Sequence, residues 1–160
     1  MGDRISIQFE SKGDYIDKKG KWISSDDKEH DGRTDKSVAF FSHWDGLGLT
    51  LEAVNYAKEL IEGIETKKIS ANGPLGRFEV NTVMVDFIRY FIRDRVESNY
   101  YLGVDSDDGD NSNNGNWIID LDNGTIKPDS DVHSFFTDKL GTEAHDVSSW
   151  WLDVQEHDLY

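Results

Sequence analysis

Residues 37–63 read SVAFFSHWDGLGLTLEAVNYAKELIEG, and this stretch joins a strand to a helix. Its first part, 37–44, is rich in apolar and aromatic side chains, which is typical of a buried strand. A turn, DGLG, follows at 45–48, and Thr50 is placed to cap a helix. Apolar residues then recur at helical spacing up to Gly63. The stretch therefore predicts both strand and helix within one packed unit.

A second helix is predicted over residues 79–96, EVNTVMVDFIRYFIRDRV. Its apolar side chains recur every three or four positions, which is the spacing of one helix face. The stripe is wide enough to be buried on more than one side, and it consists of Val80, Val83, Met84, Phe87, Ile88, Phe91 and Ile92.

Three further stretches predict strands. Residues 4–9 alternate polar and apolar side chains, so every second one faces the same side. Residues 100–105 and 116–122 are expected to be two more strands, and they lie close enough in sequence to pair as a hairpin around the loop between them. An Asn-Gly pair at 123–124 then signals a tight turn.

The C-terminal region predicts a short helical segment, in which Ser148 or Ser149 caps a turn through Trp150, Trp151 and Val154. Taken together, the patterns predict the α+β class. We expect a mostly antiparallel sheet of about four or five strands, with two principal helices packed on one face and the short helical C-terminal segment.

The length predicts a single domain spanning 1–160. Two polar stretches interrupt it. The first, which we call the insert (11–36), has apolar pairs at 15–16 and 22–23 around a Lys-Lys-Gly turn. It is expected to be a small hairpin that stands off the body or else a mobile loop. The second, which we call the acidic loop (105–116), contains no large side chain.

Charge is distributed unevenly along the chain. The net charge is −15, and residues 103–160 carry −12 of it, with twelve Asp and two Glu against two Lys. An acidic field of this kind repels phosphates, so direct binding of nucleic acid is not expected. It attracts cations and basic protein surfaces instead.

Composition also bears on the compartment. The chain has no Cys, which excludes disulfides and thiolate metal sites and fits a reducing cytoplasm. Residues 1–4 lack the basic and apolar run of a signal peptide, and no stretch is apolar enough to span a membrane. We therefore expect a cytoplasmic protein that does not associate with membranes.

The acidic loop and the strand after it carry a candidate metal site. If the strands at 100–105 and 116–122 paired, their acids would converge, and hard cations such as Ca²⁺ prefer oxygen ligands of this kind. The spacing does not fit an EF-hand, and a solvated polar turn is the alternative. The sequence does not require a cofactor. If a cation binds, we expect Ca²⁺, and its candidate ligands are Asp105, Asp107, Asp110, Asp120 and Asp122.

Two other candidate sites lie outside the acidic loop. His43 and Asp45 follow the strand at 37–44, where a His and a carboxylate can form an acid–base pair. The alternative is a strand-end His bonded to backbone. Trp150 and Trp151 are candidate anchors for a partner protein, unless they dock on this protein's own sheet.

These observations favour a non-enzymatic binding module whose acidic C-terminal face engages a divalent cation or a basic protein surface. One alternative is a DNA-mimic inhibitor of a nucleic-acid-binding protein. Another is a metal-dependent hydrolase, which requires His43 and either Asp105 or Asp120 to share one pocket. No catalytic residue is identified by the sequence.

Overall fold

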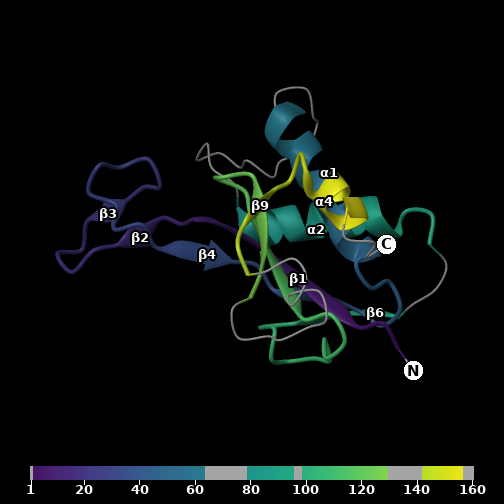
Figure 1. Ribbon diagram of the computed structural model, residues 1–160. Coiled ribbons are helices and arrows are strands. Elements are labelled where there is room, and N and C mark those ends of the chain that lie inside the picture. Colours follow the sequence, from purple (N-terminus) through teal and green to yellow (C-terminus); the bar gives the residue numbers. More distant parts are fainter. Residues whose placement is uncertain (1, 64–78, 96–98, 130–141, 157–160) are drawn as a thin grey trace.

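The computed structural model describes residues 2–63, 79–95, 99–129 and 142–156. Helices lie on one side of a twisted sheet, and the polar insert projects from the body (Figure 1). The elements, in chain order, are β1 (Ile5–Lys12), β2 (Tyr15–Ile16), β3 (Trp22–Ile23), β4 (Thr34–Lys36), β5 (Ala39–Ser42), α1 (Gly48–Gly63), α2 (Val80–Ile92), β6 (Tyr100–Gly103), β7 (Asn116–Asp120), β8 (Thr125–Pro128), β9 (His145–Asp146) and α4 (Trp150–Glu156).

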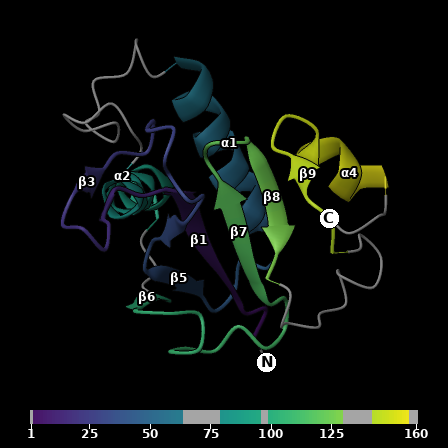
Figure 2. The same ribbon diagram turned by 90° about the vertical axis from the view of Figure 1, so that its left-hand side faces the viewer.

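The α+β prediction is confirmed, although the main sheet has seven strands within the described residues instead of about four or five. Its order is β6-β5-β1-β7-β8-β9, with β4 also paired to β1. All pairs are antiparallel except β1 with β7. Figure 2 shows β1, β7 and β8 side by side at the centre, with α1 behind them.

The hairpin expected between residues 100–105 and 116–122 is wrong. β6 pairs with β5, and β7 pairs with β1 and β8, so two strands separate β6 from β7. Sequence proximity favoured the hairpin, but the apolar β5 and β1 occupy the centre of the sheet. Burying them stabilises the fold more than a hairpin of half-exposed strands would.

Both principal helices pack on the same face of the sheet. Phe87 of α2 makes edge-on ring contacts with Phe9 of β1 and Phe40 of β5, at centroid distances of 5.7 and 5.9 Å. The expected apolar stripe of α2 is buried except at Ile88, which is partly buried, and at Ile92, which is 41% exposed. α2 ends at Ile92 instead of residue 96, and Glu79 caps it by accepting the backbone N–H of Asn81 at 3.0 Å.

α1 begins at Gly48, three residues earlier than an N-cap at Thr50 predicts, so Thr50 is inside its first turn and is not its N-cap. The buried Thr50 hydroxyl donates to the Leu47 carbonyl at 2.6 Å. The same oxygen accepts the indole N–H of Trp150 at 2.9 Å. Thr50 therefore ties the C-terminal helix α4 to the start of α1.

The insert (11–36) forms the predicted hairpin. Tyr15 pairs with Ile23, and Ile16 pairs with Trp22. Gly20 has φ +79 in the connecting turn, a conformation that glycine adopts without strain. In Figure 1 this hairpin lies apart from the helices and the centre of the sheet. The end of the insert returns to the body as β4, which pairs with β1.

None of the helices within the described residues is long and apolar enough to cross a membrane.

Candidate functional site

The face of the sheet that turns away from the helices buries polar side chains at its centre. Ser6 and Gln8 of β1 and Asn116 of β7 are at most 2% exposed. In the parallel pairing of β1 with β7, Ser6 lies directly opposite Asn116. A buried polar group is costly unless it is hydrogen-bonded, so the partners of these three side chains decide whether this face is stable.

These side chains are joined in what we call the amide network (Ser6, Gln8, Asn111 and Asn116). Asn116 accepts the Ser6 hydroxyl at 2.7 Å and donates to Gln8 Oε1 at 2.9 Å. Gln8 donates in turn to the Ser37 carbonyl at 2.9 Å. Asn111, which lies in the acidic loop, donates to the Ser6 hydroxyl at 2.8 Å. The network therefore connects the acidic loop to the middle of the sheet.

A second set of bonds fixes the acidic loop to the start of β1. The Asn114 side chain donates to Asp3 at 2.6 Å and to the Arg4 carbonyl at 2.9 Å. Its backbone N–H also donates to the Arg4 carbonyl, at 2.9 Å. Asn113 accepts the backbone N–H of Arg4 at 3.0 Å, and the Arg4 guanidinium lies 3.0 Å from Asp110. The loop is thus ordered by tertiary bonds and is not a free turn.

The loop backbone also packs directly against aromatic rings. A methyl group at Gly109 would lie 2.6 Å from the Phe41 ring and 2.7 Å from the Tyr101 ring. These two rings are stacked, with centroids 4.8 Å apart. The Tyr101 hydroxyl accepts the backbone N–H of Asp110 at 2.8 Å. Only a residue without a side chain permits this close approach, so glycine is needed at position 109.

The carboxylates of the loop point outward from this anchored backbone. Asp105, Asp107, Asp108 and Asp110 are all exposed. Hydrogen bonds from Ser112, followed by the charges of Arg4 and His43, hold the pKa of Asp110 below its ordinary value. The lowered pKa favours the charged form of Asp110, and the exposed acids of the loop are carried on a backbone that tertiary hydrogen bonds hold in place.

The five predicted metal ligands fall into two groups. Asp110 contacts Arg4 before the start of β1, whereas Asp122 accepts the backbone N–H of Lys12 at the end of β1, at 2.7 Å. A strand rises about 3.3 Å per residue, so these two anchoring points are about 26 Å apart. Asp105 and Asp107 belong to the first group and Asp120 to the second.

The second group has structural partners. Asp120 accepts the backbone N–H groups of Asp122 and Asn123 and the Asn123 side-chain amide, at 2.7 to 3.1 Å. These bonds shape the turn between β7 and β8. Among the described residues, no group of three or more His, Asp or Glu side chains is arranged to hold a metal ion.

His43 and Asp45 lie close in the chain but do not form an acid–base pair in the described contacts. The Asp45 carboxylate accepts the Ser42 hydroxyl at 2.5 Å, while the Asp45 backbone N–H donates back to that hydroxyl at 3.2 Å. The His43 ring packs edge-on against Trp44 at 4.4 Å. Asp45 thus closes the turn before α1.

His43 lines a shallow cavity of about 350 Å³ at the end of β5 and β6. Neither Asp105 nor Asp120 is among its described lining residues. The cavity is aromatic, and its described lining consists of His43, Trp44, Asn99, Tyr100 and Tyr101.

The two candidate anchor tryptophans have different environments. Trp150 is fully buried and packs against Trp117 of β7 at a centroid distance of 5.2 Å. It therefore docks on this protein's own sheet, as the alternative interpretation expected. Trp151 is 48% exposed, and Leu152 beside it is 62% exposed.

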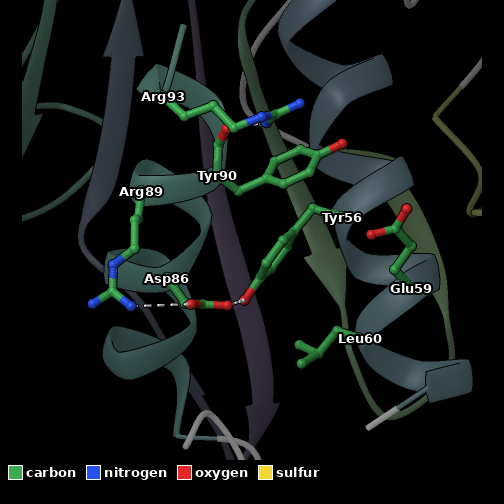
Figure 3. Close-up of a pocket in the computed structure, with 7 residues that line it drawn as sticks. All are labelled: Tyr56, Glu59, Leu60, Asp86, Arg89, Tyr90 and Arg93. Atoms are coloured by element: carbon green, nitrogen blue, oxygen red, sulfur yellow. Dashed lines mark hydrogen bonds and ion pairs between the residues drawn. The ribbon is translucent and has the colours of Figure 1, made fainter. Parts of the chain in front are cut away.

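A pocket of about 360 Å³ lies between α1 and α2, on the side of the helices away from the sheet's polar face (Figure 3). We call it the interhelical pocket. Leu60 and the rings of Tyr56 and Tyr90 form its apolar surface. Four charged side chains complete the lining: Glu59 from α1 and Asp86, Arg89 and Arg93 from α2.

A hydrogen bond joins the two helices at this pocket. The Tyr56 hydroxyl donates to Asp86 at 2.7 Å, and Arg89 lies 4.0 Å from the same carboxylate. Burial, and then the bond to Asp86, raises the pKa of Tyr56. Arg93 lies over the Tyr90 ring, 4.4 Å from its centroid, and donates to the Tyr90 carbonyl.

Comparisons of the chain with protein-family models, with curated proteins and with solved structures found no match.

Sequence reasoning missed the amide network and the interhelical pocket. Asn111 was expected in the acidic loop and Asn116 at the start of a strand, but no local pattern shows that β7 pairs with β1 and brings the two asparagines together with Ser6. A signal for the pocket was present in the helical spacing, because Tyr56 lies four residues before Leu60 and Asp86 four residues before Tyr90.

Proposed function

We propose that the protein is a non-enzymatic binding module whose acidic loop (105–116) engages a basic protein surface. The observation that carries this proposal is the fixed position of the exposed carboxylates. The loop's backbone is held by Asn111, Asn113 and Asn114, while its acids face solvent. A net charge of −15 adds a field that draws basic partners toward the molecule.

Fixed carboxylates favour binding for an energetic reason. A mobile loop loses conformational freedom when it is held against a partner, and this loss weakens binding. The amide network removes most of that loss in advance, because the loop is ordered in the free protein. Long-range attraction between opposite charges then raises the association rate, which makes binding strongly dependent on salt.

The direct test compares two variants that lose the same charge. In the first, Asp105, Asp107 and Asp108 are each changed to Asn, which keeps an oxygen that accepts the same backbone N–H groups. In the second, Asp26→Asn, Glu29→Gln and Glu62→Gln remove three exposed acids elsewhere. The probe is a short peptide of alternating Lys and Arg, measured by calorimetry at low and physiological salt.

We expect the loop variant to bind the peptide about tenfold or more weakly, since tenfold corresponds to about 1.4 kcal/mol. The matched variant should bind with nearly the original affinity. If both variants weaken binding equally, net charge alone explains the attraction and the proposal is wrong.

Calcium binding is tested separately by thermal unfolding in millimolar CaCl₂ and in NaCl of equal ionic strength. A larger rise of Tm in CaCl₂ would support a cation in place of a protein partner, because a ligand stabilises only the state that binds it. The DNA-mimic alternative predicts that the protein displaces duplex DNA from a nucleic-acid-binding partner. The DNA-mimic alternative would be supported if the unmodified protein displaced the duplex and the loop variant did not.

A further inference from the structure

We propose that the interhelical pocket binds a small zwitterion with an apolar side chain, of the kind represented by a free amino acid. This inference concerns a different surface from the acidic loop and goes beyond the proposed function. It rests on the size of the pocket, on its apolar floor and on the opposite charges of its two walls (Figure 3).

Size limits the ligand to a small molecule. The cavity of about 360 Å³ lies near the lower end of the range usual for small-molecule pockets, which is about 300 to 1,000 Å³. Its surface is mostly apolar, with Leu60 below and the Tyr56 and Tyr90 rings beside it (Figure 3). An aliphatic or aromatic side chain buried there would gain stabilisation in proportion to its apolar area.

The walls of the pocket carry charges of opposite sign. The arginines Arg89 and Arg93 extend from α2, whereas Glu59 extends from α1 on the other side (Figure 3). Burial, and then the charges of Glu52 and Glu59, raises the pKa of Tyr90. Of these two acids, Glu59 lines the pocket.

Asp86 does not reverse this polarity. Its carboxylate accepts the Tyr56 hydroxyl at 2.7 Å and is 4.0 Å from Arg89, so two donors already compensate its charge at the base of the pocket. Arg93 also lies 3.5 Å from the exposed Asp94 carboxylate, so a ligand carboxylate would bind beside an existing ion pair. An ammonium placed toward Glu59 would meet a charge of opposite sign. A ligand with only one charge would satisfy only one wall.

The test uses the full chain and three probes that share one phenyl ring. L-Phenylalanine carries both charges, 3-phenylpropionate lacks the ammonium group, and phenethylamine lacks the carboxylate. Affinities are measured by titration in a two-dimensional ¹⁵N NMR spectrum, in which the backbone signals of Tyr56, Leu60 and Tyr90 report on the pocket. We expect L-phenylalanine to bind at least about tenfold more tightly than either analogue, since a charge-assisted bond contributes roughly that much.

Variants separate the two walls. Arg93→Gln should weaken the binding of L-phenylalanine about tenfold and leave the binding of phenethylamine unchanged. Glu59→Gln should also weaken the binding of L-phenylalanine about tenfold, but it should leave the binding of 3-phenylpropionate unchanged. Glu62→Gln is the matched control, because Glu62 is an exposed acid of α1 that does not line the pocket. It should change none of the affinities.

Three results would overturn the proposal. One is the absence of pocket shifts with every probe at millimolar concentration. Another is equal binding of L-phenylalanine and its two analogues, which would leave only an apolar contact. The third is an unchanged affinity for L-phenylalanine in both Arg93→Gln and Glu59→Gln. None of these results bears on the acidic loop, so the two proposals fail or survive independently.

Discussion

The insert (11–36) and the acidic loop (105–116) are both polar segments, but they have different structures. Both contain several Asp and Gly together with Ser or Asn, while the insert also carries six Lys and the apolar pairs at 15–16 and 22–23, which the acidic loop lacks. The hydrogen bonds described within the insert's projecting part span 17 residues or fewer. Those that anchor the acidic loop join residues 105 to 111 positions apart. The projecting part of the insert is ordered by its own contacts, whereas the acidic loop is ordered by contacts with the sheet.

The difference comes from the type of polar side chain. The acidic loop ends in asparagines, whose neutral amides donate and accept hydrogen bonds and can be buried without the cost of burying a charge. The insert uses exposed ion pairs instead, such as Asp31 with Arg33 at 2.6 Å. Exposed ion pairs contribute little to stability, so the insert should open more easily than the acidic loop.

The largest effect is expected at the centre of the amide network. Asn116→Ala removes the partner of the Ser6 hydroxyl and of Gln8 Oε1, and both groups remain buried. We expect the free energy of unfolding, measured in urea, to fall by about 3 kcal/mol. Asn55→Ala, at an exposed position of α1, should change it by less than about 0.5 kcal/mol. A similar small change at both positions would mean that the network contributes no stability.

The next effect tests the close packing beneath the acidic loop. In Gly109→Ala the new methyl group meets the Phe41 and Tyr101 rings at less than 3 Å. We expect a loss of about 1 to 3 kcal/mol in the free energy of unfolding, the usual cost of overpacking. Asp107→Ala, an exposed position in the same loop, should stay within about 0.5 kcal/mol. Equal effects would show that the loop backbone moves freely away from the rings.

A smaller effect is expected in the insert. Tyr15 lies under the Arg33 guanidinium, 3.7 Å from its ring centroid, and contacts the His30 ring at 5.1 Å. Tyr15→Ala should lower the free energy of global unfolding by less than about 1 kcal/mol, because an exposed cation–π contact contributes only about 0.5 to 1 kcal/mol. Amide exchange at Lys19 and Lys21 should nevertheless accelerate. Global destabilisation comparable with that of Asn116→Ala would contradict the separation of the two segments.

The smallest effect concerns pH. The hydrogen bond from Arg33 lowers the pKa of Asp31 from 3.8 to about 2. Because the folded pKa is depressed, the stabilisation is present above pH 3.8 and is lost as the pH falls toward about 2. A ¹³C NMR titration of the Asp31 carboxyl should show a midpoint near 2, and Arg33→Gln should return it toward 3.8. A midpoint near 3.8 in the unmodified protein would mean that the pair is not formed in solution.

The helices and the hairpin of the insert could be predicted because their signals are local. The stripe through Val80, Val83 and Phe87 repeats with the helical period, and the pairs at 15–16 and 22–23 flank a short turn. The capping role assigned to Thr50 was wrong because α1 already begins at Gly48, and the bond that its hydroxyl accepts from Trp150, 100 residues away, could not be seen in the local sequence. Tertiary contacts of this length leave no periodic pattern in the sequence.

The candidate sites were harder to predict for the same reason. Asp105 and Asp120 seemed to share a face because their strands are consecutive among the expected elements, yet β5 and β1 lie between those strands. Conversely, Tyr56 and Asp86 are 30 residues apart and come together only when α1 packs on α2. Burial of apolar strands and helix packing decide both outcomes, and neither depends on the acids themselves.

Native-state hydrogen exchange tests the central comparison most directly. The backbone N–H groups of Asn114 and Gly115 are bonded to the Arg4 and Asn111 carbonyls, and those of Lys19 and Gly20 are bonded to Asp17. All four amides are hydrogen-bonded, so their exchange rates report the free energy of opening. The account predicts that Asn114 and Gly115 exchange only with global unfolding, while Lys19 and Gly20 exchange through a local opening of low free energy. Equal protection of the two segments would contradict it.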